Sequence, residues 1–144
     1  MTTPGNCDIA RYVSILREAT RLDASIQSVE YFCYRDIPER PAIIRFTCGE
    51  TSIFVIANAD DDTIWISKEA PSDLVEMGAQ DHSSMNPWTS ILGTELAWGW
   101  ALTNQEGYID GVQFQFHDGN GRSVRCIQMM VLASTISVAD ITLS

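Results

Sequence analysis

The sequence is poor in positive charge. Its 144 residues include one lysine and eight arginines against 19 aspartates and glutamates, which leaves a formal net charge of −10 at pH 7. Proteins that bind nucleic acids neutralise phosphates with clustered lysine and arginine side chains, and the sequence offers no such cluster. The same charge opposes approach to anionic lipid. The composition therefore argues against nucleic acid and membranes as partners and favours a protein partner with a basic surface.

The sequence also lacks long hydrophobic runs. None approaches the roughly 18 residues that a membrane-spanning helix needs. The first residues, Met1 to Asn6, have neither the basic stretch nor the apolar core of a secretory signal. We therefore expect a cytoplasmic location. With 45% hydrophobic residues in 144 positions, the chain should form a single globular domain over residues 1–144.

Closely spaced metal ligands and catalytic motifs are missing as well. The nearest two of the four cysteines, Cys33 and Cys48, are fifteen positions apart, so no pair has the spacing of a structural zinc site. We expect free thiols that pack as small hydrophobic side chains. The sequence contains no nucleophile elbow, glycine-rich phosphate loop or zinc-protease motif. We therefore expect no metal and no cofactor, and a binding protein rather than an enzyme.

Hydrophobic periodicity divides the chain into one helix followed by strands. Between Asp8 and Leu22, apolar residues recur with helical spacing at Ile9, Val13 and Leu16. From residue 26 onward the period changes to two, which is typical of strands. We expect eight strands, over residues 26–34, 42–48, 51–57, 63–67, 95–102, 108–117, 123–133 and 135–141.

The segment between residues 69 and 94 is irregular. Pro71 and Pro87 each stand where the first turn of a short helix could begin. Helices and strands do not alternate along the chain in the way that a parallel sheet requires. The sequence thus predicts an α+β fold. Its N-terminal helix packs on a mainly antiparallel sheet of six to eight strands, with a short helical insertion in the middle.

The strand over residues 95–102 has two unequal faces. Strict alternation places bulky residues on one face, namely Leu96, Trp98, Trp100 and Leu102. It places small residues on the other, namely Ala97, Gly99 and Ala101. The small face can accept the N-terminal helix at short distance. We expect a central strand with both faces buried, because two exposed tryptophans would make a large apolar patch on a monomer.

A glycine-flanked segment after this strand contains candidate ligand-binding residues. Asp110 lies between Gly107 and Gly111, and glycines permit the close approach of a ligand. One interpretation is an aromatic pocket with a few polar groups, lined by Trp98, Trp100, Tyr108, Asp110 and His117. The other is a β-bulge or hairpin turn over the core, which the turn-like sequence over residues 104–107 favours.

The acidic run from Asn58 to Asp62, together with Glu69, matches part of the ligand spacing of a calcium loop. The sixth position of such a loop is Thr63, where a sharp turn needs glycine, and the residues that follow have the pattern of a strand. We therefore expect these carboxylates to lie at the solvated tip of a hairpin.

The sequence Trp98-Gly99-Trp100, followed by residues 104–114 and a final hairpin, resembles a bacterial family of small proteins catalogued as a domain of unknown function. The resemblance covers the later and larger part of the chain and implies no catalytic residues. In size, acidity and α+β layout the chain is also similar to immunity proteins of bacterial toxin systems.

Two functions agree with these observations. The first is a non-enzymatic protein-binding module of the immunity type, which meets a basic partner or pairs as a homodimer. The acidic charge, the missing catalytic motifs, and the aromatic and methionine side chains of the second half favour it. The second is a small-molecule binder or enzyme that uses the aromatic pocket.

Overall fold

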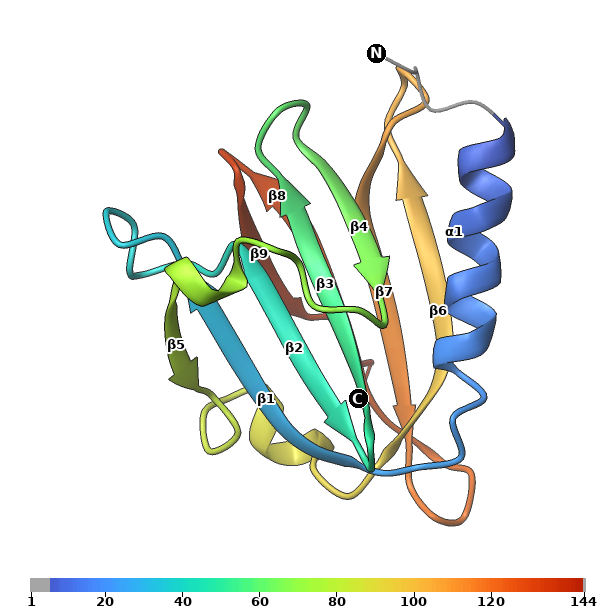
Figure 1. The fold of residues 1–144 in the computed structure, drawn as a ribbon. Coiled ribbons are helices and arrows are strands. Elements are labelled where there is room, and N and C mark those ends of the chain that lie inside the picture. Colours follow the sequence, from blue (N-terminus) through green and yellow to red (C-terminus); the bar gives the residue numbers. More distant parts are fainter. Residues whose placement is uncertain (1–5, 144) are drawn as a thin grey trace.

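The computed structural model describes residues 6–143, with side chains from Ile9 onward, and arranges them as two antiparallel sheets and one α-helix (Figure 1). The first sheet contains β1 (Ile26–Cys33), β2 (Ile43–Cys48), β3 (Thr51–Asn58), β4 (Thr63–Ser67) and β5 (Gly78–Asp81). The second contains β6 (Glu95–Thr103), β7 (Ile109–His117), β8 (Ser123–Leu132) and β9 (Thr135–Asp140). The strand orders are β4-β3-β2-β1-β5 and β6-β7-β8-β9.

The helix α1 (Asn6–Ala19) closes one side of the space between the sheets (Figure 1). It packs against β4 of the first sheet and β6 of the second. Among its side chains from Ile9 onward, those of Tyr12, Leu16 and Ala19 are buried. Two short 3-10 turns, η1 (Leu74–Glu76) and η2 (Trp88–Ile91), lie in the middle of the chain, and η2 packs against β8.

The main core lies between the two sheets, because alternation along each strand turns one row of apolar side chains inward. Phe46 of β2 stands at its centre, with its ring 5.7 Å from that of Phe114 and 6.2 Å from that of Phe116. Trp88 of η2 packs edge-on against the same ring at 5.3 Å. Each such buried side chain contributes about 1.5–3 kcal/mol to folding.

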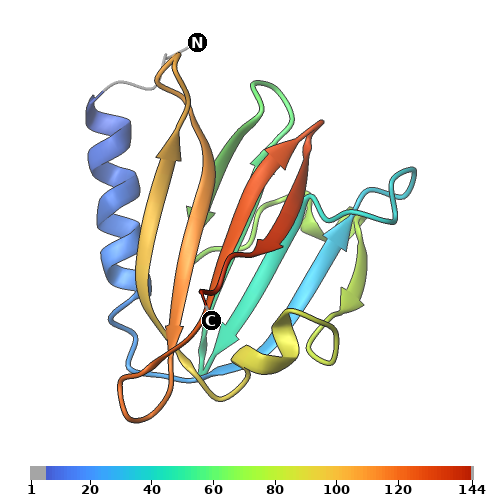
Figure 2. The same cartoon turned by 180° about the vertical axis from the view of Figure 1, so that it is seen from behind.

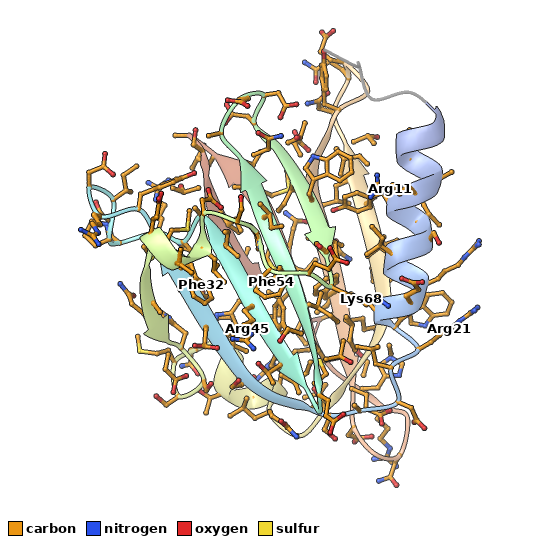
Figure 3. The ribbon with its side chains drawn as sticks, viewed as in Figure 1. Arg11, Arg21, Phe32, Arg45, Phe54 and Lys68 are labelled. Carbon is orange, nitrogen blue, oxygen red and sulfur yellow. The ribbon has the colours of Figure 1, made fainter. Side chains whose placement is uncertain are left out.

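A smaller apolar cluster occupies the outer face of the first sheet. Phe32, Ile43 and Phe54 form it, and the segment through η1 covers them with Leu74 and Met77. Figure 3 shows Phe32 and Phe54 on this face with Arg45 beside them. Much of the outer face of the first sheet is therefore already occupied by the chain itself.

The predicted single sheet is wrong, because nine strands form two separate sheets that cover one another. The reason is the size of the helix. At 14 residues, α1 is about 21 Å long, too short to cover the inner faces of eight or nine strands. No helix in residues 6–143 is both long and apolar enough to cross a membrane.

The predicted helical insertion is also wrong in its detail. The segments after Pro71 and Pro87 form single 3-10 turns, and the strand β5 lies between them, paired with β1. The eight predicted strands are confirmed within one or two residues at each end. The expectation of free, buried thiols is confirmed for Cys33 and Cys48, whereas Cys126 is half-buried and Cys7 lies outside the described side chains.

Candidate functional site

The strand β6 does not keep strict alternation, because Ala97 is an extra residue opposite β7. Leu96 pairs with Phe116, and Trp98 pairs with the next residue along, Gln115. After such a bulge, every later side chain lies on the face opposite to the one that strict alternation would give it. The predicted common face of Leu96 and the two tryptophans is therefore wrong.

Trp98 and Trp100 point away from the core and remain 60% and 41% exposed. The expectation that both faces of this strand are buried is therefore wrong for the outer face. The strand is also an edge strand rather than the central one, since it pairs only with β7 in its sheet. The inner face of β6 packs on the core. In residues 6–143, no helix or strand packs over its outer face.

The small inner face of β6 accepts the helix, as predicted. A Cβ atom placed on Gly99 would lie 2.6 Å from Cδ2 of Leu16, closer than carbon atoms can approach. Glycine at this position thus lets α1 pack directly on the strand. Leu16 fills the space, and its side chain is only 5% exposed.

Most side chains of β6 to β9 that point away from the core form one surface, which we call the β6–β9 outer face; the outward pair Glu95 and His117 lies beyond its end and is not counted in it. It consists of Trp98, Trp100, Leu102, Gly111, Gln113, Gln115, Cys126, Gln128, Met130, Leu132, Ser137 and Ala139. None of these side chains is charged, and the nearest outward carboxylate is that of Glu95 at the end of β6. In Figure 2, which shows the molecule from behind, no helix lies in front of the four strands.

Side-chain size changes across this face from β6 to β9. One cross-strand row runs from Trp100 through Gln113 and Gln128 to Ala139. The neighbouring row runs in the same order through Leu102, Gly111, Met130 and Ser137. The edge at β6 is therefore bulky and the edge at β9 is nearly flat.

Hydrogen bonds within the face hold its polar side chains in place. The Nε2 atom of Gln113 donates to Sγ of Cys126 at 3.4 Å. At the end of the face, the Nε2 atom of Gln115 donates to Oγ of the neighbouring Ser123 at 2.9 Å. A surface ordered in this way loses little side-chain entropy when a partner covers it.

The structure does not bring the five predicted site residues into one pocket. The turn before β7 is held by Asn104, whose Oδ1 accepts from the backbone nitrogens of Glu106 and Tyr108 at 2.9 and 3.3 Å. Asp110 is an extra residue in the register of β7, and its carboxylate accepts from Nδ2 of Asn104 at 3.3 Å. This segment is the hairpin turn and bulge that the second interpretation predicts. His117 lies at the far end of β7, about 24 Å from Asp110.

A groove of about 420 Å³ runs between α1 and β6. The residues that line it include Val13, Leu16, Arg17, Trp98 and Trp100. Tyr108, Asp110 and His117 do not line it. The two tryptophans thus border both this groove and the β6–β9 outer face.

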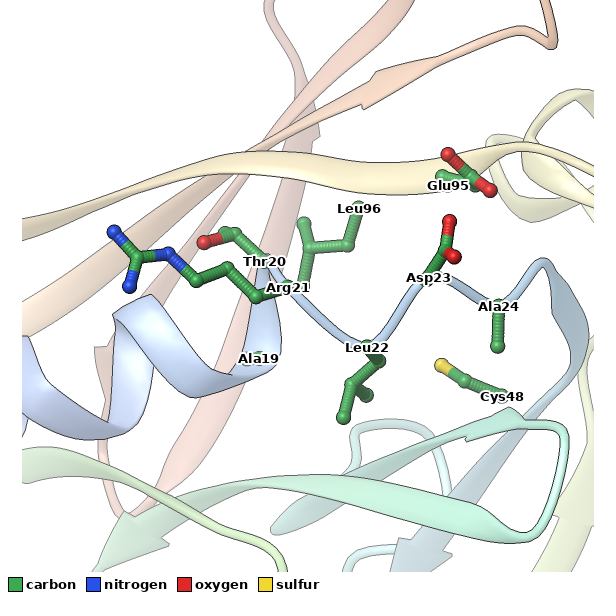
Figure 4. A pocket seen from close by; sticks show the side chains of 9 residues that line it. All are labelled: Ala19, Thr20, Arg21, Leu22, Asp23, Ala24, Cys48, Glu95 and Leu96. Carbon is green, nitrogen blue, oxygen red and sulfur yellow. The ribbon is translucent and has the colours of Figure 1, made fainter.

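A second hollow, of about 260 Å³, lies where α1 ends and β6 begins (Figure 4). The carboxylates of Asp23 and Glu95 point toward each other there. Cys48 lines the hollow, and burial raises the pKa of its thiol to about 11. The thiol therefore stays protonated at neutral pH and is a poor nucleophile.

The acidic run after β3 forms the tip of a hairpin, as predicted. Oδ1 of Asp61 accepts from the backbone nitrogen of Thr63 at 3.1 Å, and Oδ1 of Asp62 accepts from that of Ser134 at 3.2 Å. Within the part of the chain that the structure describes, no three His, Cys, Asp or Glu side chains gather as a metal site would require.

Negative charge gathers instead at the end of the first sheet. The carboxylates of Asp73, Asp36 and Asp60 lie near Tyr34, and together with burial they raise the pKa of its hydroxyl. Burial is the largest of these causes. These three carboxylates thus lie at the first sheet and not on the β6–β9 outer face.

The outward residues of β7 are a sequence signal for the β6–β9 outer face that the apolar alternation alone does not reveal. In β7, the inward Val112, Phe114 and Phe116 alternate with Gln113 and Gln115. Outward positions of an exposed strand in an acidic protein would ordinarily hold charged residues. Uncharged amides at consecutive outward positions therefore mark a surface of unusual composition.

Comparison with known proteins gives a family without an activity. Residues 19–143 match a family of unknown function, DUF6334. No curated protein and no solved structure matches the chain. The match includes all nine strands and the last residue of α1. The chain therefore belongs to the DUF6334 family.

Proposed function

We propose that this chain is a cytoplasmic protein-binding module whose docking surface is the β6–β9 outer face. The observation that carries the proposal is a pair of tryptophans, 60% and 41% exposed, on an uncharged face of a chain with a net charge of −10. Exposed apolar patches of this kind mark interaction sites. Tryptophan is also the residue type most enriched among side chains that dominate binding energy.

The chemistry of the face favours a protein over a nucleic acid. Aromatic rings on a sheet can stack with bases, but nucleic-acid binding also requires cations that follow the phosphates. The face supplies no lysine or arginine for that purpose. Rigid indole rings, amides and a methionine are side chains that protein interfaces favour.

A partner with a basic surface, which the composition favours, would have to meet a different part of the molecule. The carboxylates around Tyr34 belong to the first sheet and its loops. The β6–β9 outer face offers such a partner no ion pair. We therefore rank this partner below one that binds the uncharged face.

Site-specific photo-cross-linking tests the proposal. A photoreactive amino acid in place of Leu132, which is 53% exposed on the β6–β9 outer face, should give a cross-linked protein adduct in cells that express the chain. The matched control places the same group at Val75, which is 89% exposed beside the first sheet. Equal adduct yields at the two positions, or none at Leu132, would contradict the proposal.

The groove between α1 and β6 supports a second candidate, a small-molecule binder. Its volume of about 420 Å³ lies within the range of ligand pockets, and Trp98 and Trp100 border it. A ligand held there should raise the melting temperature by several degrees in a metabolite screen. It should fail to do so in a Val13→Trp variant, because Val13 is half-buried at the groove and the larger side chain would fill it.

A further inference from the structure

We infer that the partner of the β6–β9 outer face is a second copy of this chain, related to the first by a two-fold axis parallel to the strands. The inference rests on the proposed function and names the partner for the same surface. Three features of the face carry it: its gradient of side-chain size, the amides at its centre and its missing charge.

A two-fold axis parallel to the strands, lying between two such faces, reverses the strand order of the second copy. The strand β6 of one copy then lies over β9 of the other, and β7 lies over β8. Sheets that pack in this way keep their strands within about 30° of one another, roughly 10 Å apart. Each contact occurs twice, as in any two-fold interface.

The size gradient makes the face complementary to itself under this rotation. Trp100 on the bulky edge of one copy lies over Ala139 on the flat edge of the other, and Ala139 is exposed. In the same way, Leu102 of one copy lies over Ser137 of the other. Bulky side chains thus lie over small ones on both sides, which is the packing that fills an interface.

The centre of the face is complementary as well. Gln113 and Gln128 are paired within one copy and occupy the two middle strands. The rotation places Gln113 of one copy over Gln128 of the other. An amide both donates and accepts hydrogen bonds, so the two side chains can pair across the interface.

Charge also favours a second copy, and the area of the face agrees with a weak dimer. Two chains that each carry a charge of −10 repel one another, and this face lets them touch without bringing like charges together. Four strands span about 20 Å across, and seven residues span about 24 Å along them. The face thus covers about 480 Å² in projection, the size of a weak interface of less than about 1,200 Å² in total.

A size swap tests the contact between Trp100 and Ala139. Trp100→Ala leaves two holes in the dimer, and Ala139→Trp brings two pairs of indoles into collision. Sedimentation velocity should show each variant dissociating on the order of 100-fold more readily than the wild type. An equimolar mixture should form a heterodimer within about 10-fold of the wild-type affinity, since its two contacts are one native and one exchanged. Circular dichroism checks that each variant is folded.

The salt dependence of the same measurement separates a second copy from a basic partner. Added NaCl screens the repulsion between two acidic chains, so the wild-type dimer should tighten. Binding to a basic partner would weaken instead.

Three results would overturn the inference: a wild-type chain that stays monomeric over micromolar concentrations, a dimer that neither variant weakens, and a mixture that does not recover. If the chain is monomeric while Leu132 cross-links a different protein, the proposed function stands and the second copy does not. If Leu132 cross-links nothing, both fall.

Discussion

Replacing Trp88 with alanine should lower the free energy of unfolding by about 3–5 kcal/mol, because the change leaves a large cavity between the two sheets. The indole is 0% exposed and contacts Phe46 of the first sheet, while the turn η2 that carries it packs against β8 of the second. A domain of this size has a total stability of about 5–15 kcal/mol. The variant should therefore lose a large part of its stability and unfold at a clearly lower urea concentration than the wild type.

A hydrogen bond adds to the contribution of Trp88. Its Nε1 atom donates to Oη of Tyr31 at 2.7 Å within the core. In a Tyr31→Phe variant the indole nitrogen loses its acceptor, and a buried donor without a partner costs about 1–3 kcal/mol. The double variant with Trp88→Phe removes both polar groups and should cost less than the sum of the single changes.

Urea unfolding followed by circular dichroism measures these differences without relying on tryptophan fluorescence. Val75→Ala is the matched control, since Val75 is 89% exposed and should change stability by less than about 0.5 kcal/mol. A midpoint for Trp88→Ala that equals that of the control would show that η2 does not join the two sheets.

The second large effect is expected at Gly99. A Gly99→Val substitution should destabilise the fold by about 2–3 kcal/mol, because its side chain needs the space that Leu16 of α1 fills. The helix would have to move away from β6, and the groove between them would open. Gly119→Val is the matched control, because nothing lies within 4 Å of a Cβ atom placed there.

A double-mutant cycle identifies Leu16 as the cause. In a Leu16→Ala background the space above Gly99 is empty, so adding Gly99→Val should cost at least about 1 kcal/mol less than it does in the wild type. Chemical denaturation gives all four stabilities. If the destabilisations caused by Leu16→Ala and Gly99→Val simply add in the double variant, the valine clashes with something other than the helix.

Local sequence patterns predicted the elements well but not their assembly. The period-two pattern located eight strands, and the small face of residues 97–101 correctly indicated where the helix packs. The strand β5 was not predicted, because Gly78 to Asp81 are all exposed and show no apolar alternation. It is a strand only because its backbone pairs with β1, which is a tertiary effect.

The candidate surface depended on one residue that no periodicity reveals. The bulge at Ala97 places Leu96 and the two tryptophans on different faces. Strict alternation therefore predicts, wrongly, that the tryptophans share the buried face of Leu96. Pairing between strands decides this register, and pairing partners are far apart in the sequence. The exposed tryptophans could therefore be recognised as a surface only once β7 was placed beside β6.

Alkylation of Cys126 tests most directly whether a second copy covers the β6–β9 outer face. This thiol is half-buried on that face and burial raises its pKa, so its labelling with iodoacetamide, a small neutral reagent, is followed at one alkaline pH. At constant pH its labelling should slow as the protein concentration rises, and it should not slow in the Trp100→Ala variant. Cys48, which is buried with its pKa raised to about 11, should react slowly throughout and serves as the internal control. A wild-type Cys126 that reacts at the same rate at every concentration would contradict the account.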